Sequence, residues 1–232
     1  MTREEDLCTG LDDVRRRVAA ACLDAGRDAD EVTVVVVTKF FPASDVRLLA
    51  GLGVVDVGEN RHQEAQQKAA DCADLDLRWH YIGGLQSNKA AAVAAYADCV
   101  QSVDRAKLLA PLARGAEGRE QPLDVCLQVS LDPPGADHRA GVDPDVLLDL
   151  AARAASTDGL TLRGLMAVAP LGADPGEAFD RLAGIRDGFL VEHPDATWLS
   201  AGMSGDLEAA VARGATHVRV GSAVLGSRPS VP

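Results

Sequence analysis

Apolar and polar residues follow one another along the chain in blocks that predict helices and strands in turn. Residues 4–26 predict an amphipathic helix, because apolar residues recur there at helical spacing: Leu7, Leu11, Val14, Val18 and Leu23. The next block, VTVVVVTK at 32–39, is apolar without alternation. A strand buried on both faces has this pattern, so the block indicates a parallel sheet. Residues 43–53 then predict a helix that ends in glycine.

The same order of elements continues through the rest of the chain. Seven more segments predict strands: 54–60, 78–84, 98–104, 123–131, 162–170, 196–204 and 216–224. Helices are predicted between them at about 61–74, 88–97, 105–118, 143–157, 175–192 and 205–213. Eight such steps predict an α/β fold, a single (β/α)8 TIM barrel with an extra N-terminal helix. A doubly wound open sheet is the alternative. No low-complexity linker divides residues 1–232, so we expect one domain.

The composition allows a large core and narrows the range of partners. Of the 232 residues, 47% are apolar, and the net charge is −12. An acidic surface opposes general binding to nucleic acid and to anionic membranes. The start of the chain has no apolar signal segment, and no stretch reaches the roughly 18 apolar residues of a membrane-spanning helix. We therefore expect a cytoplasmic protein.

The spacing of cysteines and histidines predicts neither a disulfide framework nor a metal site. The chain has five cysteines, an odd number, and no two are spaced as C-x-x-C. Its five histidines show no zinc-ligand spacing, and most are expected to be structural or exposed.

Lys39 is the strongest candidate for a chemically reactive residue, because it ends a predicted apolar strand. In a barrel, the loops after the strands build the site, so Lys39 should lie at its mouth. An amine held there loses its proton more readily than a solvated one, and a neutral amine attacks an aldehyde to form a Schiff base. The alternative is a surface lysine that caps the strand.

Two glycine turns with hydroxyl groups follow the last two predicted strands, in AGMSGD (201–206) and VRVGSAVLG (218–226). Barrels often bind phosphate at these two loops, and glycine lets backbone N–H groups approach the oxygens closely. Ser204 and Ser222 add hydroxyl donors. The alternatives are an N-cap for Ser204 and a plain turn for Gly221.

Arg219 lies two residues before Gly221, inside an otherwise apolar strand. A buried arginine needs a partner. One such partner is the pyridine nitrogen of pyridoxal phosphate (PLP), whose protonation the guanidinium would disfavour. The alternative is a structural ion pair with Asp56 or Glu59.

Six segments, taken together, resemble the YggS/PROSC-type pyridoxal phosphate homeostasis proteins. They cover nearly the whole chain: VTKFFPASDV (37–46), VGENRHQEA (57–65), WHYIGGLQSNK (79–89), SVDR (102–105), RGLMAVAP (163–170) and SAGMSGDLEAAVARGATHVRVGSAVLG (200–226).

This resemblance implies a barrel like the N-terminal domain of alanine racemase and an internal aldimine between PLP and Lys39. It further implies that Ser204, Gly221 and Ser222 hold the phosphate. Arg219 would face the pyridine nitrogen, and Asn60 would line the ring pocket. The function implied is to hold PLP and to take part in its intracellular homeostasis and delivery, without an established catalytic reaction and with no catalytic residue.

Three positions depart from the family pattern. Thr38-Lys39-Phe40 stands where Ser-Lys-Thr is frequent, so the neighbours of the lysine differ. Ser222 stands where threonine is frequent, which keeps a hydroxyl. Arg139 stands where many members have a lysine, and arginine does not readily form an imine.

Three functions remain open at this point: a PLP carrier, a PLP-dependent amino-acid racemase, and a phosphate-binding barrel enzyme without PLP. The chain ends soon after the last predicted strand, without a second domain, and neither Tyr81 nor Tyr96 is in a clear base position. Since two-sided proton transfer needs two positioned bases, we favour a carrier that is not an enzyme. We expect a monomer, PLP-dependent apo-enzymes as recipients, and the loop at 132–144 as a candidate gate.

Overall fold

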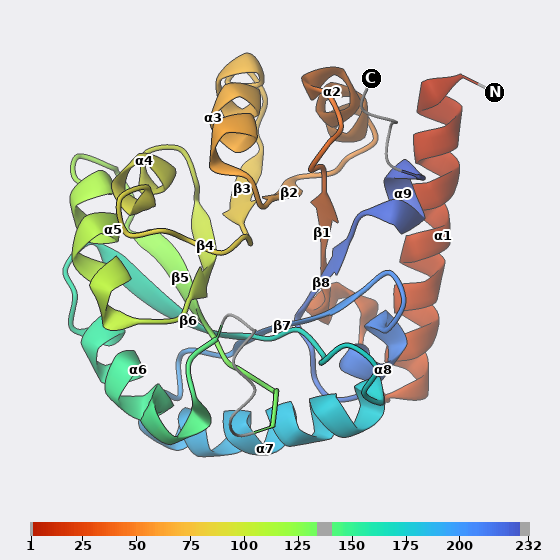
Figure 1. Cartoon of the computed structure of the whole chain (residues 1–232). Helices are drawn as coiled ribbons and strands as arrows, with labels where there is room; N and C mark the ends of the chain where they lie inside the picture. Colours follow the sequence, from red (N-terminus) through yellow and green to blue (C-terminus); the bar gives the residue numbers. More distant parts are fainter. Residues whose placement is uncertain (1, 134–140, 228–232) are drawn as a thin grey trace.

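Eight parallel strands close into a barrel in the computed structural model, which describes residues 2–133 and 141–227 (Figure 1). The strands are β1 (Thr33–Val37), β2 (Asp56–Glu59), β3 (Arg78–Tyr81), β4 (Cys99–Val103), β5 (Leu123–Gln128), β6 (Leu160–Met166), β7 (Trp198–Met203) and β8 (His217–Val220). Because β1 pairs with both β2 and β8, the sheet has no free edge. The predicted barrel is therefore confirmed, and the open sheet is excluded.

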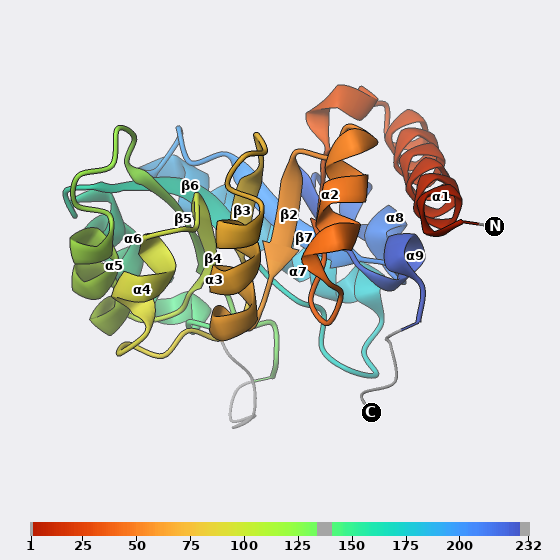
Figure 2. The same ribbon diagram turned by 90° about the horizontal axis from the view of Figure 1, so that it is seen from above.

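Helices surround the barrel, as Figures 1 and 2 show from two directions. They are α1 (Arg3–Asp24), α2 (Ala43–Gly51), α3 (His62–Asp71), α4 (Ala90–Ala94), α5 (Leu109–Gly115), α6 (Leu147–Ala155), α7 (Pro175–Glu192), α8 (Leu207–Val211) and α9 (Ser222–Leu225). Within the described residues, no helix is both long and apolar enough to cross a bilayer.

The strand predicted at 216–224 extends beyond the end of the observed strand. Strand β8 stops at Val220, and residues 222–225 form α9 instead. Val224 and Leu225 are apolar, but they are buried against α1 rather than in the sheet. The gate expected at 132–144 includes residues 134–140, and with them Arg139, which lie outside the described residues.

Helix α1 packs its apolar face on the barrel near β1 and β8, beside α8 and α9 (Figure 2). Four of the five apolar residues predicted for this face are buried, whereas Leu23, near the end of the helix, is 79% exposed. Gly10 allows the backbone of α1 to approach that of α9 closely. A Cβ atom there would lie 2.7 Å from the carbonyl oxygen of Val224 and 2.9 Å from that of Ala223.

A charged residue of α1 reaches the turn after β7. Arg17 Nη2 donates to the carbonyl oxygen of Ser204 at 3.0 Å, and its Nε donates to Glu208 Oε1 at 2.6 Å. The extra N-terminal helix thus supports both turns that follow the last two strands.

We predict that Gly10→Ala lowers the free energy of unfolding by about 1–3 kcal/mol, because overpacking forces two helix backbones apart. Gly51→Ala is the matched control, since a Cβ atom at Gly51 meets no atom within 4 Å. The control should raise the free energy of unfolding by up to about 1 kcal/mol, the ordinary gain of alanine over glycine in a helix. Urea unfolding measures both. Equal stability of the two variants would show that α1 and α9 can separate without cost.

Candidate functional site

A cavity of about 300 Å³ lies at the carboxyl ends of β1, β7 and β8. Five residues predicted from the sequence line it together: Lys39, Ser204, Arg219, Gly221 and Ser222. Lys39 is far from the other four in sequence, and the pairing of β1 with β8 brings it beside them. The rest of the wall is largely apolar and includes Val37, Phe40, Phe41, Ile82 and Met203.

The two glycine turns lie side by side on this wall. The hydroxyl oxygen of Ser204 accepts from the backbone N–H of Ala223 at 3.4 Å, which joins the turn after β7 to the turn after β8. Asp206, not Ser204, is the N-cap residue of α8. The N-cap alternative for Ser204 is therefore wrong.

Glycine keeps space open beside these hydroxyl groups. A Cβ atom at Gly205 would meet nothing within 4 Å, and its backbone N–H donates to no backbone acceptor within the described ranges. At Gly221, a Cβ atom would lie 3.3 Å from the carbonyl oxygen of Val37. Together, these turns offer backbone N–H and hydroxyl donors to an oxyanion.

Arg219 places a positive charge in the wall of the cavity. It is only 4% exposed, and it donates from Nη1 to Ser200 Oγ at 2.7 Å and from Nη2 to the carbonyl oxygen of Ala167 at 2.8 Å. Burial lowers the pKa of Arg219 to about 10, so it remains charged at neutral pH. Arg219 makes no ion pair in the part of the chain that the structure describes. The predicted alternative partners bind elsewhere: Asp56 contacts His80, and Glu59 contacts Lys68.

The segment around Lys39 has an unusual backbone. Phe40 has φ +71°, a left-handed conformation that is rare for a bulky residue. Its backbone N–H donates to Glu64 Oε1 at 2.5 Å. Lys39 Nζ lies 6.0 Å from the centre of the Phe40 ring, and Arg61 Cζ lies 5.5 Å from it. Phe40, one of the departures from the family pattern, thus has its ring near two cations, Lys39 and Arg61.

A buried cluster behind Lys39 fixes this conformation. Lys68 Nζ donates to Glu59 Oε1 at 2.6 Å, to Glu64 Oε1 at 2.7 Å and to the carbonyl oxygen of Thr38 at 2.7 Å. Thr38 Oγ1 also donates to Glu59 Oε1, at 2.7 Å. The residues on both sides of Lys39 are therefore tied to α3. Sequence reasoning missed this cluster, although the four-residue spacing of Glu64 and Lys68 on a predicted helix was a visible signal.

Asn60 is the one predicted site residue that does not line the cavity. It follows β2, and Gly83 packs against its backbone so closely that a Cβ atom there would lie 2.1 Å from the carbonyl oxygen of Asn60. Its side-chain oxygen Oδ1 is buried and accepts no hydrogen bond within the described residues. A role for Asn60 toward a ligand stays a prediction.

Comparison with known proteins places this chain in a family. The model for the N-terminal domain of alanine racemase matches residues 18–229. A pyridoxal phosphate homeostasis protein from Mycobacterium leprae is 42% identical over 242 residues, which cover 97% of this chain and 93% of the relative. The chain belongs to the pyridoxal phosphate homeostasis family.

Two further matches agree with this assignment. A pyridoxal phosphate homeostasis protein from Escherichia coli is 34% identical, covering 96% of this chain and 97% of the relative. PipY from Synechococcus elongatus, whose structure was solved with PLP bound, is 36% identical. The match covers 92% of this chain and 100% of PipY, with a TM-score of 0.78.

We predict that Lys68→Met destabilises this family member by about 3–5 kcal/mol, because it leaves a buried carboxylate without its partner. Burial raises the pKa of Glu59, and Lys68 opposes that rise. Without Lys68, the pKa of Glu59 in the folded protein rises further, and so lies further above its value in the unfolded chain. Stability is then lost as pH rises through the folded-state pKa, so the deficit should be larger at pH 8 than at pH 4.

Urea unfolding at the two pH values measures this deficit. Lys107→Met, at an exposed lysine, is the control and should change little. Adding Glu59→Gln to Lys68→Met should remove the pH dependence of the deficit. A deficit that is independent of pH in the single variant would contradict the role given to Glu59.

Proposed function

We propose that this chain, as one domain spanning residues 1–232, binds PLP in the cavity at Lys39 and takes part in its storage and delivery. One observation carries the proposal: Lys39, the two glycine turns and Arg219 line the same cavity. Its volume, about 300 Å³, is at the lower end of the range of about 300–1,000 Å³ for small-molecule sites. The name of the Mycobacterium leprae relative and the PLP-bound structure of PipY support this assignment.

Each wall of the cavity suits one part of the cofactor. Ser204, Gly205, Gly221 and Ser222 would hold the phosphate with hydroxyl and backbone donors. The amine of Lys39 would form the covalent bond, because bound PLP supplies an aldehyde carbon that amines attack reversibly. Arg219 has only donors, so a ring nitrogen facing it would act as an acceptor and stay unprotonated.

The makeup of the cavity wall favours holding the cofactor over turning over a substrate. Among the lining residues that the structure describes, none is a histidine, a tyrosine or a carboxylate. The Tyr96 hydroxyl lies 3.5 Å from His62 Nδ1, and neither Tyr96 nor Tyr81 lines the cavity. Two-sided proton transfer at a substrate carbon needs two positioned bases. We therefore propose a non-catalytic carrier and place racemase activity second. We also propose that the carrier is monomeric and cytoplasmic, as expected from the sequence.

Lys39→Ala tests the covalent bond. Wild-type protein incubated with PLP should show visible absorbance that remains on the protein after gel filtration, and borohydride should fix the label on Lys39. Lys39→Ala should lose at least 90% of the fixed label while its circular dichroism is unchanged. Lys89→Ala, at an exposed lysine outside this cavity, is the control and should keep the label. Fixed label in Lys39→Ala would reject Lys39 as the anchor.

A transfer assay tests the carrier role. Loaded protein is mixed with a PLP-dependent apo-enzyme and compared with free PLP at the same concentration. We expect the apo-enzyme to regain activity at least as fast from the loaded protein, and still to do so when a trap removes free PLP. Recovery that the trap abolishes would contradict direct delivery. Protein-dependent exchange of the α-hydrogen of an amino acid would favour the racemase alternative instead.

A further inference from the structure

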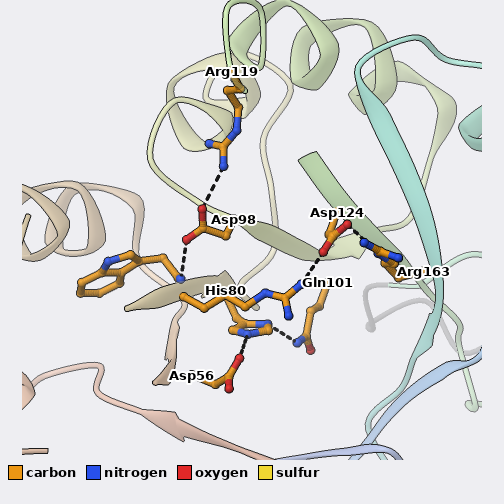
Figure 3. A network of polar contacts seen from close by, with 9 residues as sticks. Asp56, His80, Asp98, Gln101, Arg119, Asp124 and Arg163 are labelled. Carbon is orange, nitrogen blue, oxygen red and sulfur yellow. Dashed lines mark hydrogen bonds and ion pairs between the residues drawn. The ribbon is translucent and has the colours of Figure 1, made fainter. Parts of the chain in front are cut away.

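Arg219 is one end of a chain of hydrogen bonds that runs through the inside of the barrel. Its Nη1 donates to Ser200 Oγ at 2.7 Å, and Ser200 Oγ donates to Gln101 Oε1 at 2.6 Å. Gln101 Nε2 lies 2.9 Å from His80 Nδ1, and His80 Nε2 lies 2.7 Å from Asp56 Oδ1. Figure 3 shows the ring of His80 between Asp56 and Gln101.

The chain links the two ends of the barrel. Asp56 is the first residue of β2, and its side chain is 19% exposed at the amino-terminal end. Between it and Arg219, the side chains of His80, Gln101 and Ser200 are almost completely buried. Five residues from five strands thus connect a carboxylate near solvent to the guanidinium in the cavity wall.

The donors and acceptors of the chain are ordered. Arg219 can only donate, so Ser200 accepts from it and gives its own proton to Gln101. With a neutral His80 ring, the Gln101 amide donates to Nδ1, and the Nε2–H donates to Asp56. Every hydrogen bond then points from the cation toward the carboxylate. Such a chain polarises along its length, and it leaves few alternatives for the orientation of Arg219.

Protonation of His80 gives a second arrangement, which is the one expected at neutral pH, whereas the order described above belongs to the ring above about pH 9. Burial lowers the pKa of His80, but hydrogen bonds with Asp56 and Cys99 outweigh burial and raise it to about 9. A protonated ring donates from both nitrogens, so the Gln101 amide must then offer its oxygen to His80 and its NH2 group to Ser200. Cys99 and His217 also lie near the ring, with the His217 ring centre at 6.3 Å, and Arg78 acts on His217 and Asp56. At the other end of the chain, Asp206 and Cys126 act on Arg219. Arg78 is paired with Asp124, and burial lowers the pKa of His217 to about 3.

We propose that Ser200, Gln101, His80 and Asp56 are positioning residues that fix the guanidinium of Arg219 and so set the charge that faces the ring nitrogen of bound PLP. This inference rests on the proposed function of the cavity. The chain acts through Arg219, since none of its other four members lines the cavity.

Ser200→Ala and Asp56→Asn test the proposal at the two ends of the chain. The readout is the visible absorbance of the loaded protein as a function of pH. If Arg219 is held less firmly, its positive charge opposes protonation of the bound cofactor less strongly. We expect the titration midpoint to rise in both variants by about half a pH unit or more, the size of a modest change in a charge–charge interaction.

Ser102→Ala is the matched control. Ser102 is a buried serine on β4, one residue from Gln101, and its hydroxyl has no hydrogen-bond partner among the described residues. This variant removes a buried hydroxyl without touching the chain, so its titration midpoint should equal that of the wild type. A midpoint that moves equally in Ser102→Ala would overturn the proposal.

A second measurement needs no cofactor. In 15N-labelled protein without PLP, the side-chain N–H signals of Arg219, assigned by their loss in Arg219→Lys, should shift in Asp56→Asn and not in Ser102→Ala. Unchanged Arg219 signals, or unchanged midpoints in loaded Ser200→Ala and Asp56→Asn, would overturn the role of the chain. If borohydride fixes no label on the wild-type protein, the proposed PLP-binding function is contradicted. The proposed effect of the chain on bound PLP is then contradicted as well.

Discussion

The pairing of β1 with β8 is the interaction on which the site depends. Val34 lies opposite Val218 and Val36 opposite Val220 in the closing ladder, so the last strand returns beside the first. Because all strands are parallel, their carboxyl ends meet in one ring. This closure brings Lys39 to a turn that lies about 180 residues later in the chain. In an open sheet with the same strand order, β1 and β8 would be the two outer strands, so Lys39 would lie far from the two glycine turns.

Closure brings the strand ends together, but elements outside the barrel give them their conformation. Lys68 on α3 holds the backbone on both sides of Lys39, one side through Thr38 and the other through Glu64. Arg17 on α1 holds the carbonyl group of Ser204, and Gly10 lets the same helix press on α9. Since backbone strain such as that at Phe40 persists only where surrounding contacts fix it, α3 is as much a part of the site as β1, the strand that precedes Lys39.

The barrel and most of the cavity could be predicted because both follow from local pattern and one topological rule. Apolar runs mark the strands, and residues at strand ends converge when a parallel sheet closes. The Lys68 cluster could not be predicted in full, because its contact with Glu59 depends on the rotation of α3 against β2. The chain from Arg219 to Asp56 depends on the register of five strands, and nothing in the sequence around His80 distinguished it from other histidines. Helix α9 was missed because residues 222–224, which end in the β-branched Val224, suit the end of a strand as well as a helix.

In the function proposed above, the arginine in the wall would govern the electronic state of the bound cofactor rather than its attachment. A guanidinium without a carboxylate partner offers donors to a ring nitrogen and repels a proton there, so the ring of bound PLP would withdraw electrons weakly. The two glycine turns and the amine of Lys39 would still provide attachment, because neither depends on ring protonation. The strength of PLP binding and the electron withdrawal by its ring would thus be separate properties of this cavity. Along the hydrogen-bonded chain, the balancing charge of Arg219 is Asp56, at the opposite end of the barrel, and outside the chain the charge of Asp206 raises the pKa of the guanidinium against its burial.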